Sequence, residues 1–316
     1  MWDHSRLLYL SRRLSLVESV RYWHCQANRP TLPFVPTCSG ACPEDVEQLK
    51  RYVQQCQRLF VITGAGISTE SGIPDYRSEH VGLFARTQRR PVEHGMFVRS
   101  ARMRQSYWAR SFTGWTSFLR HLPNAAHLAL SHWERAGRLH WLVTQNVDAL
   151  HRKSGSLRCT ELHGCLYLVI CLNCGQVTHR EQLQKRMVVM NPHWQVDALE
   201  VAPDGDVLLS ESQVENFRVP ACLACEGILK PQVTFFGDNV DRATVAFLYK
   251  KLAESDGILI AGSSLQVYSA YRFVREAHDQ GLPIAILNIG PTRANTLAML
   301  TINARCGDVL PLALDI

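Results

Sequence analysis

No apolar run in this sequence is long enough to cross a membrane as a helix. The longest, such as residues 257–262 and 284–289, fall far short of the roughly 20 residues that a span requires. The sequence also lacks any run of lysine or arginine longer than two residues, and it has no internal repeat or low-complexity tract. We therefore expect neither a membrane nor a nucleic-acid partner.

Lysine is absent from the first 30 residues, which hold five arginines against two acidic residues and so carry half of the formal net charge of +6. Leucines are interspersed with these arginines, and the uninterrupted apolar segment of a secretory signal is missing. This composition is typical of a mitochondrial presequence, so residues 1–30 are expected to direct the protein to the mitochondrial matrix. The alternative is a disordered basic tail. Prolines at positions 30, 33 and 36 predict a linker over residues 31–42.

With 316 residues, 46% of them hydrophobic, the chain can bury a full core in one large or two moderate domains. Short apolar segments that predict buried strands alternate with segments that predict helices, such as residues 43–56 and 243–255. The predicted strands are residues 58–63, 140–144, 232–236, 257–261 and 284–289. This order favours an α/β fold with a doubly wound parallel, Rossmann-like sheet.

Four of the eleven cysteines form two C-x-x-C pairs, Cys171 with Cys174 and Cys222 with Cys225. Two such pairs close a tetrahedral shell around one Zn²⁺ and leave no open position, so the sequence predicts a structural zinc. A disulfide pair or a redox couple is the alternative. Residues 175–221 exceed the usual spacing between such pairs and predict an inserted loop. The remaining cysteines show no ligand spacing and are expected to be ordinary small residues: Cys25, Cys38, Cys42, Cys56, Cys159, Cys165 and Cys306.

A glycine-rich loop follows the first predicted strand. Gly64 and Gly66 stand as in a dinucleotide-binding fingerprint, where backbone N–H groups approach a pyrophosphate. The third glycine of that fingerprint is missing, because Thr69 occupies its position and the next glycine is Gly72. Some twenty residues further on, where a ribose-binding acid is expected, the chain reads "VGLFARTQRR". The pattern of a redox dinucleotide enzyme therefore fails here.

The loop continues into "SGIPDYRS" and resembles the sirtuin family, in which NAD is a consumed substrate. Other motifs of that family stand in order: "TQNVDALH" at 144–151, "LHG" at 162–164, the cysteine pairs, "LKPQVTFFGD" at 229–238, "GSSLQV" at 262–267 and "LNIGP" at 287–291. The resemblance covers about residues 40–312 and is strongest to the mitochondrial class II members. It implies a catalytic domain over residues 43–316, Rossmann-like over 43–164 and 229–316, with a zinc module over 165–228.

The resemblance implies a reaction in which an acyl-lysine amide oxygen attacks the anomeric carbon of the nicotinamide ribose and expels nicotinamide. His163 would then deprotonate a ribose hydroxyl, a task suited to an imidazole that titrates near neutral pH. Asn146 and Asp148 carry over as catalytic residues that contact the ribose and nicotinamide; the alternative is a turn that caps a helix starting near Val147. The products would be free lysine and O-acyl-ADP-ribose.

The same motifs imply an NAD site. Asp75 and Ile73 would help to seat the carboxamide, and Arg77 the charged cofactor. Tyr76 stands where the family usually has Phe, which puts the reaction rate in doubt but not the chemistry. The full set of expected NAD contacts is Gly64, Ala65, Gly66, Ile73, Asp75, Tyr76, Arg77, Gln145, Asn146, Asp148, Gly262, Ser263, Ser264, Asn288, Ile289, Gly290 and Cys306.

Acylated-lysine proteins are the partners that the resemblance implies. Their peptide would add as a strand between "VTFFGD" and "SLQVYS", while the acyl-lysine enters a channel lined by Val233, Phe236, Gly237 and Val267. Asp238 departs from the Glu usual in the family, and ordinary sheet core is the alternative for these segments. The oligomeric state stays open, with a monomer preferred.

The acyl preference depends on Tyr107 and Arg110, which are three residues apart and share a face if helical. In the desuccinylase branch of the sirtuins a Tyr-x-x-Arg pair grips a distal carboxylate, which suits a phenol and a guanidinium. This similarity predicts weak deacetylation and better removal of longer acyl groups. Acidic or branched groups such as glutaryl or 3-hydroxy-3-methylglutaryl are expected ahead of succinyl, and lipoyl is an apolar alternative. The alternative is that Arg110 is solvated on a surface helix with Arg102 and Arg104.

Two other functions use the same site. Capture of the activated ADP-ribose by a protein side chain would make the chain a mono-ADP-ribosyltransferase. A third possibility is a NAD-sensing binding protein with low turnover. The presence of His163, Asn146 and Asp148 together argues against an inactive enzyme.

Overall fold

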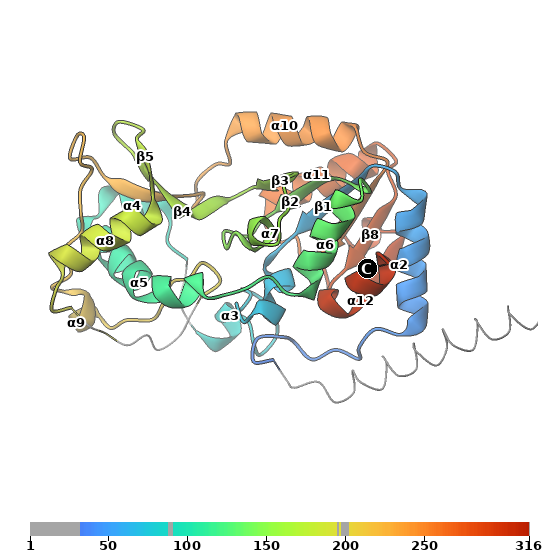
Figure 1. Ribbon diagram of the computed structural model, residues 1–316, viewed down its shortest axis with the longest axis horizontal. Helices are drawn as coiled ribbons and strands as arrows, with labels where there is room; N and C mark the ends of the chain where they lie inside the picture. Colours follow the sequence, from blue (N-terminus) through green and yellow to red (C-terminus); the bar gives the residue numbers. More distant parts are fainter. Residues whose placement is uncertain (1–31, 88–90, 195, 197–201, 316) are drawn as a thin grey trace, which may run out of the picture. The chain divides into compact units, whose positions relative to one another are not determined.

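A six-stranded sheet with only parallel neighbours forms the centre of the larger lobe in the computed structural model (Figure 1). The structure describes residues 32–87, 91–194, 196 and 202–315. The expected presequence lies outside these residues, and residues 34–316 form one compact unit. No helix in the described ranges is long and apolar enough to span a bilayer.

The strand order β3-β2-β1-β7-β8-β9 is that of a doubly wound sheet. The chain runs outward from β1 to β3 and later returns to place β7 on the other side of β1. This reversal puts the carboxyl ends of β1 and β7 side by side, with Thr63 opposite Ala261. Ligands of open α/β sheets bind at such a switch point. The strands are β1 (Leu59–Thr63), β2 (Leu139–Thr144), β3 (Cys159–Glu161), β7 (Gly257–Ala261), β8 (Ile284–Leu287) and β9 (Leu300–Ile302).

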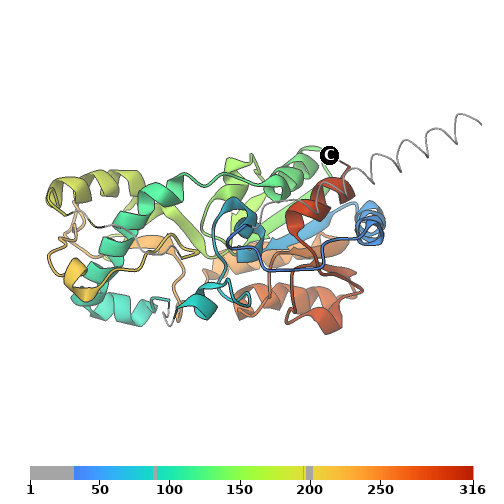
Figure 2. The same ribbon diagram turned by 90° about the horizontal axis from the view of Figure 1, so that it is seen from below.

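Helices cover both faces of this sheet. Phe60 and Ile62 of β1 point toward α10 (Arg242–Ala253) and α11 (Tyr268–Asp279), where Phe273 joins them in one apolar cluster. On the opposite side lies α6 (Ala125–Arg135), which contacts β2. The helix α12 (Cys306–Ala313) packs against α6. Figure 2 shows the two groups of helices on opposite sides of the sheet. The helices of the second face are α2 (Pro43–Gln55), α6 and α12 (Cys306–Ala313).

A smaller lobe is built on the antiparallel sheet β5-β4-β6. The long helix α5 (Ala101–Leu119) packs against it, and Trp108 of α5 donates its indole N–H to the carbonyl of Leu229. Arg180 is 1% exposed beneath this helix, and its guanidinium carbon lies 4.7 Å from the ring centroid of Trp115. The other elements of this lobe are β4 (Gly164–Cys171), β5 (Val177–His179), β6 (Leu229–Val233), α4 (His94–Arg99), α8 (Arg180–Met190) and α9 (Glu211–Val214).

One predicted strand is wrong in both position and partner. Residues 232–236 were expected to join the parallel sheet, but the strand is β6, which ends at Val233 and pairs antiparallel with β4. The apolar run misleads because Phe235 and Phe236 leave the sheet and reach the cavity described below. The strands at 58–63, 140–144, 257–261 and 284–289 and the helices at 43–56 and 243–255 are confirmed to within two residues at each end.

Candidate active site

A cavity of about 800 Å³ lies at the carboxyl ends of β1 and β7, within the size range of small-molecule and cofactor sites. All but two of the residues predicted to contact NAD, acyl-lysine or the reacting atoms line it. The exceptions are Cys306 and Arg110. The lining residues from that set are Gly64, Ala65, Gly66, Ile73, Asp75, Tyr76, Arg77, Tyr107, Gln145, Asn146, Asp148, His163, Val233, Phe236, Gly237, Gly262, Ser263, Ser264, Val267, Asn288, Ile289 and Gly290.

The glycine loops after β1 and β7 touch one another through their backbones. A Cβ on Gly66 would lie 2.8 Å from the carbonyl oxygen of Gly262. Gly262 has a φ of +62°, and a Cβ there would lie 2.3 Å from the nitrogen of Ile67. Glycine is therefore required at this crossing, because any side chain would push the loops apart.

Thr69, which stands where the third glycine of the fingerprint is expected, forms a hydrogen bond inside the loop. Thr69 lies within the short 3₁₀ helix η1 (Ala65–Ser71), where its hydroxyl donates to the carbonyl of Gly66 at 2.9 Å. Gly72 ends this helix in the left-handed conformation, with φ +84°. The chain thus turns at Gly72, three residues after Thr69, and leads directly into Ile73 and Asp75.

Asn146, Ser68 and Asp148 form a buried hydrogen-bond network on the floor of the cavity. The Asn146 side-chain amide donates to Ser68 Oγ and to the carbonyl of Gly64, both at 3.0 Å. Ser68 in turn donates to Asp148 Oδ2 at 2.7 Å. Burial raises the pKa of Asp148, while its hydrogen bonds oppose that rise. These side chains are held in one arrangement before any ligand arrives.

The helix cap that was the alternative role of Asp148 is also present. Asp148 Oδ1 accepts the backbone N–H of Leu150 at 2.9 Å, at the start of α7 (Leu150–Lys153). The helix therefore begins at Leu150, and the expected start near Val147 is wrong because Ala149 has a left-handed backbone, with φ 59°. Asp148 caps the helix with one oxygen and faces the network with the other.

His163 stands between β3 and β4 with both ring nitrogens engaged. Nδ1 lies 2.9 Å from the carbonyl oxygen of Gln145, and Nε2 lies 2.7 Å from Ser269 Oγ. A carbonyl can only accept, so Nδ1 carries the proton and Nε2 offers its lone pair. Burial lowers the pKa of His163, and the Gln145 carbonyl opposes that effect. The imidazole is therefore neutral near pH 7, as a general base must be.

Asp75 shapes the loop beside the glycines. Its Oδ1 accepts the backbone N–H groups of Arg77 and Ser78 at 3.0 and 2.8 Å, and its Oδ2 accepts the Ser78 hydroxyl. Tyr76 packs against Phe84, with ring centroids 5.7 Å apart. Phe84 belongs to α3 (Leu83–Arg86), so the aromatic contact ties the loop to that helix.

The far end of the cavity is formed by the segment after β8. Asn288 donates its side-chain amide to the carbonyls of Ile289 and Gly290, which folds this segment into a fixed turn. Asn303, which the sequence did not reveal, lines the cavity and accepts the N–H of Gly290 at 2.9 Å. Cys306 is buried behind this turn, 3.8 Å from the Leu287 carbonyl, and burial raises its pKa.

The proposed peptide edge carries a half-exposed aromatic ring. Phe236 is 41% exposed, and its carbonyl accepts the N–H of His94 at 2.9 Å. Behind this edge the ammonium of Lys230 lies 3.6 Å from the Asp238 carboxylate. Burial lowers the pKa of Lys230, and Asp238 opposes that shift. The shorter acid at position 238 is thus paired with a buried lysine.

The side chains of Tyr107 and Arg110 leave α5 toward different partners. Tyr107 is buried and lines the cavity, together with Pro203 and Asp204 of the inserted loop. The Arg110 Nε lies 3.0 and 3.2 Å from the two oxygens of Asp206, in the same loop. Its side chain is only 14% exposed, so the alternative of a solvated Arg110 on a helix surface is wrong. The inserted loop is fastened to α5 by this ion pair.

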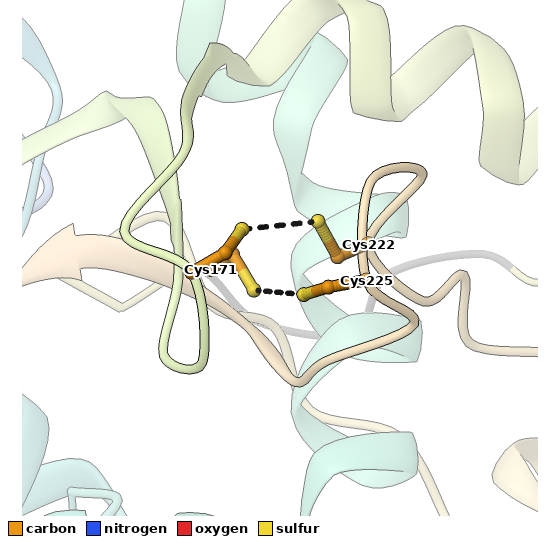
Figure 3. A group of neighbouring side chains, drawn as sticks. Cys171, Cys222 and Cys225 are labelled. Carbon is orange, nitrogen blue, oxygen red and sulfur yellow. Dashed lines mark hydrogen bonds between the residues drawn. The ribbon is translucent and has the colours of Figure 1, made fainter.

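The two C-x-x-C loops face each other in the smaller lobe. Figure 3 shows the sulfur atoms of facing loops pointing toward one another. Cys171 and Cys225 are 3.5 Å apart at sulfur, and Cys174 and Cys222 are 3.8 Å apart. A tetrahedral Zn²⁺ with Zn–S distances of about 2.3 Å requires sulfurs about 3.8 Å apart, whereas a disulfide requires about 2.0 Å. The four thiols therefore fit a closed structural zinc site and not a disulfide pair.

Comparison with known proteins gives the same family throughout. The model described as "Sir2 family" matches residues 64–269. The "NAD-dependent protein lipoamidase sirtuin-4, mitochondrial" of Homo sapiens is 60% identical over 88% of this chain and 89% of its own length. The "NAD-dependent protein deacylase Sirt4" of Drosophila melanogaster is 46% identical over 89% of this chain and 90% of its own length.

Solved structures agree with the sequence relatives. One described as "Structural Basis for the Mechanism and Regulation of Sir2 Enzymes" superposes with a TM-score of 0.66 at 27% identity, covering 87% of this chain and 98% of the other. A Sir2 homologue in complex with ADP-ribose gives 0.67 at 26% identity, with coverages of 85% and 95%. From the fold, the site and these similarities together, the chain belongs to the Sir2 family.

Proposed function

We propose that this chain is an NAD-dependent protein-lysine deacylase. One observation supports this function above all: a neutral, oriented His163 shares one cavity with the Asn146–Ser68–Asp148 network and the crossed glycine loops. The cavity thus combines a base, a set of fixed polar groups and a backbone surface for phosphates. Relatives of this chain are named as NAD-dependent deacylases and lipoamidases.

In this reaction the acyl-lysine oxygen attacks the anomeric carbon of bound NAD, and nicotinamide leaves. Asn146 and Asp148 hold the ribose and carboxamide in reach of that attack. His163 then takes a proton from a ribose hydroxyl, which attacks the acyl carbon. Lysine leaves as the free amine, and one water supplies the acyl oxygen of O-acyl-ADP-ribose. Zn²⁺ at Cys171, Cys174, Cys222 and Cys225 would hold the smaller lobe together and takes no part in this chemistry.

Lipoyl is the acyl group that the cavity favours. Its wall includes Ile73, Tyr107, Leu166 and Val233, which suit an apolar chain. Arg110 faces Asp206 and is not on the wall, while Asp204 adds a carboxylate there. A glutaryl or 3-hydroxy-3-methylglutaryl group would need Arg110 to leave Asp206, so acidic acyl groups are the second candidate. Two of the relatives are named lipoamidases.

The place of action that we propose is the mitochondrial matrix. The arginine-rich composition of residues 1–30 and the word "mitochondrial" in the names of the human and bovine relatives support it. The substrates there would be acylated-lysine proteins that add an extended segment at Phe236.

A panel of peptides carrying lipoyl-, glutaryl-, 3-hydroxy-3-methylglutaryl- or acetyl-lysine tests this function. With NAD, mass spectrometry should detect free lysine peptide and O-acyl-ADP-ribose, with lipoyl turned over faster than acetyl. A labelled protein carrying ADP-ribose, without free lysine peptide, would instead support the mono-ADP-ribosyltransferase. Absence of nicotinamide release with every peptide would leave a NAD-binding protein.

A further inference from the structure

The hydroxyl of Ser269 lies at the catalytic end of His163. Ser269 belongs to the first turn of α11, lines the cavity, and places its Oγ 2.7 Å from Nε2. This is a short hydrogen bond between neutral groups. A serine near a helix start often bonds to the backbone. Ser269 is the second residue of α11, after the N-cap Val267 and Tyr268. Its hydroxyl is directed at the imidazole instead.

The tautomer decides the direction of this hydrogen bond. Because Nδ1 donates to the Gln145 carbonyl, neutral His163 has a single in-plane lone pair, on Nε2. Ser269 must therefore donate its proton to that lone pair. The one acceptor position of the general base is already occupied by a side chain of the protein itself.

The ring of His163 and the backbone of Ser269 are both held in place. The ring of His163 is anchored by Gln145 at the other nitrogen. The backbone of Ser269 is fixed because its helix buries Ala270, Phe273 and Val274 in the core of the larger lobe. A ribose hydroxyl in the cavity thus meets the oxygen of Ser269, which still has free lone pairs, in front of a base whose own lone pair is taken.

We propose that Ser269 relays the proton from the ribose hydroxyl to His163, which extends the deacylase function proposed above. The ribose O–H bond breaks as its proton binds Ser269 Oγ, and the Ser269 O–H bond breaks as its proton binds Nε2. One proton leaves the ribose hydroxyl and one arrives on the imidazole, which becomes an imidazolium. Ser269 is neutral before and after the step, and the ribose oxygen carries the electron pair that attacks the acyl carbon.

A relay through Ser269 should affect only the second half of the reaction. Release of nicotinamide precedes the step that needs the base, whereas formation of O-acyl-ADP-ribose follows it. Ser269→Ala should therefore lower kcat for O-acyl-ADP-ribose formation by at least about tenfold, which is a part of the roughly 10²–10⁴-fold that acid–base assistance typically contributes. Nicotinamide exchange into NAD and the KM for NAD should stay within about twofold. Ser269→Thr keeps the hydroxyl and should recover most of the lost rate.

A proton inventory supplies a readout that a merely structural role would not move. Rates of the wild type in mixtures of H₂O and D₂O should give a bowed curve, because two protons move in one step. Ser269→Ala should give a straight line, because only the direct transfer to Nε2 remains. Asp279→Asn, at the exposed end of the same helix, is the matched control and should behave as the wild type.

Thermal unfolding of each variant should match the wild type and so separate lost chemistry from lost folding. The relay is wrong if Ser269→Ala is as fast as or faster than an active wild type, which would mean that Ser269 only competes for the base. It is also wrong if the wild-type inventory is a straight line. A wild type that forms no O-acyl-ADP-ribose from any peptide contradicts the deacylase function itself, which is a different outcome from these two.

Discussion

The carbonyl oxygen of Gln145 lies 2.9 Å from Nδ1 of His163 and thereby fixes Nε2 as the basic nitrogen. Both residues flank the cavity, but they come from different segments: Gln145 follows β2 and His163 follows β3. Because β2 and β3 are parallel neighbours, their carboxyl ends bring the imidazole and its orienting carbonyl to the same edge of the sheet.

Replacing His163 tests the base itself. His163→Ala should lower deacylation by roughly a hundredfold or more, because general acid–base assistance is lost. NAD binding measured by calorimetry should change little, since the Asn146 network and the glycine loops remain. Turnover within a few-fold of the wild type would show that another group acts as the base.

The pH dependence of activity follows from the burial of this imidazole. Burial lowers the pKa of His163, and only the neutral form can accept the ribose proton. The rate should therefore stay level as pH falls through about 6.5, the ordinary value for histidine, and decline only at lower pH. Steady-state kcat measured from pH 5 to 8 checks this. A decline centred above pH 7 would contradict it.

A second pair of histidines makes the fold sensitive to acid. His127 and His151 are buried with ring centroids 4.7 Å apart, and burial lowers the pKa of His151 to about 3 and that of His127 well below its usual range. Below about pH 6.5 these two histidines bind protons in the unfolded chain but stay neutral in the folded chain. The free energy of unfolding therefore falls as pH falls.

Urea unfolding at pH 7.5 and 5.5 should show a loss of roughly 1.4 kcal/mol for each of these two histidines. His151→Gln should reduce that pH dependence, whereas His132→Gln, an exposed histidine on the same helix as His127, should leave it unchanged. Equal pH dependence in the wild type and His151→Gln would refute the assignment.

The cysteine cluster should bind one zinc per chain. Its sulfurs lie within 4.8 Å of one another, so one ion satisfies all four. Cys222→Ser should lower the melting temperature and the zinc content of purified protein, because structural zinc contributes to folding free energy. Cys42→Ser, outside the cluster, is the control. Purified wild type without zinc, or Cys222→Ser with normal melting, would disprove the site.

The Arg110–Asp206 pair should set the acyl preference. Asp206→Asn removes the carboxylate that Arg110 Nε contacts, and breaking a buried pair typically costs roughly 3–5 kcal/mol of stability. It also removes a carboxylate that competes with an acidic acyl group for Arg110, so turnover of glutaryl relative to lipoyl should rise. Arg110→Met should lower that ratio or leave acidic turnover negligible. Ratios that are the same in the wild type and both variants would exclude any role of this pair in acyl choice.

The sequence predicts the larger lobe well where short apolar runs are bounded by glycines or turns. β7 is predicted to the residue, since Gly257 and Gly262 enclose it and all its residues are buried. The run at 232–236 fails because its pairing partner β4 leaves no local signal of being antiparallel. Its two phenylalanines look like strand core but serve the cavity.

The site is predictable where the motif residues lie in consecutive loops at the carboxyl ends of parallel strands. Asn146, Asp148 and His163 are of this kind. Ser269 and Asp206 are not, because each is identified only by a contact with a residue about a hundred positions away in the chain. Spacing along the sequence carries no information about such contacts, and only the packing of α11 and the inserted loop reveals them.

The central claim is tested most directly by the stoichiometry of a single reaction. Wild-type protein, NAD and a lipoyl-lysine peptide should yield free lysine peptide, nicotinamide and O-lipoyl-ADP-ribose in equal amounts by mass spectrometry, and His163→Ala should yield almost none of the last. Free lipoic acid formed without consumption of NAD, or ADP-ribose attached to protein in place of O-lipoyl-ADP-ribose, would contradict an NAD-dependent deacylase.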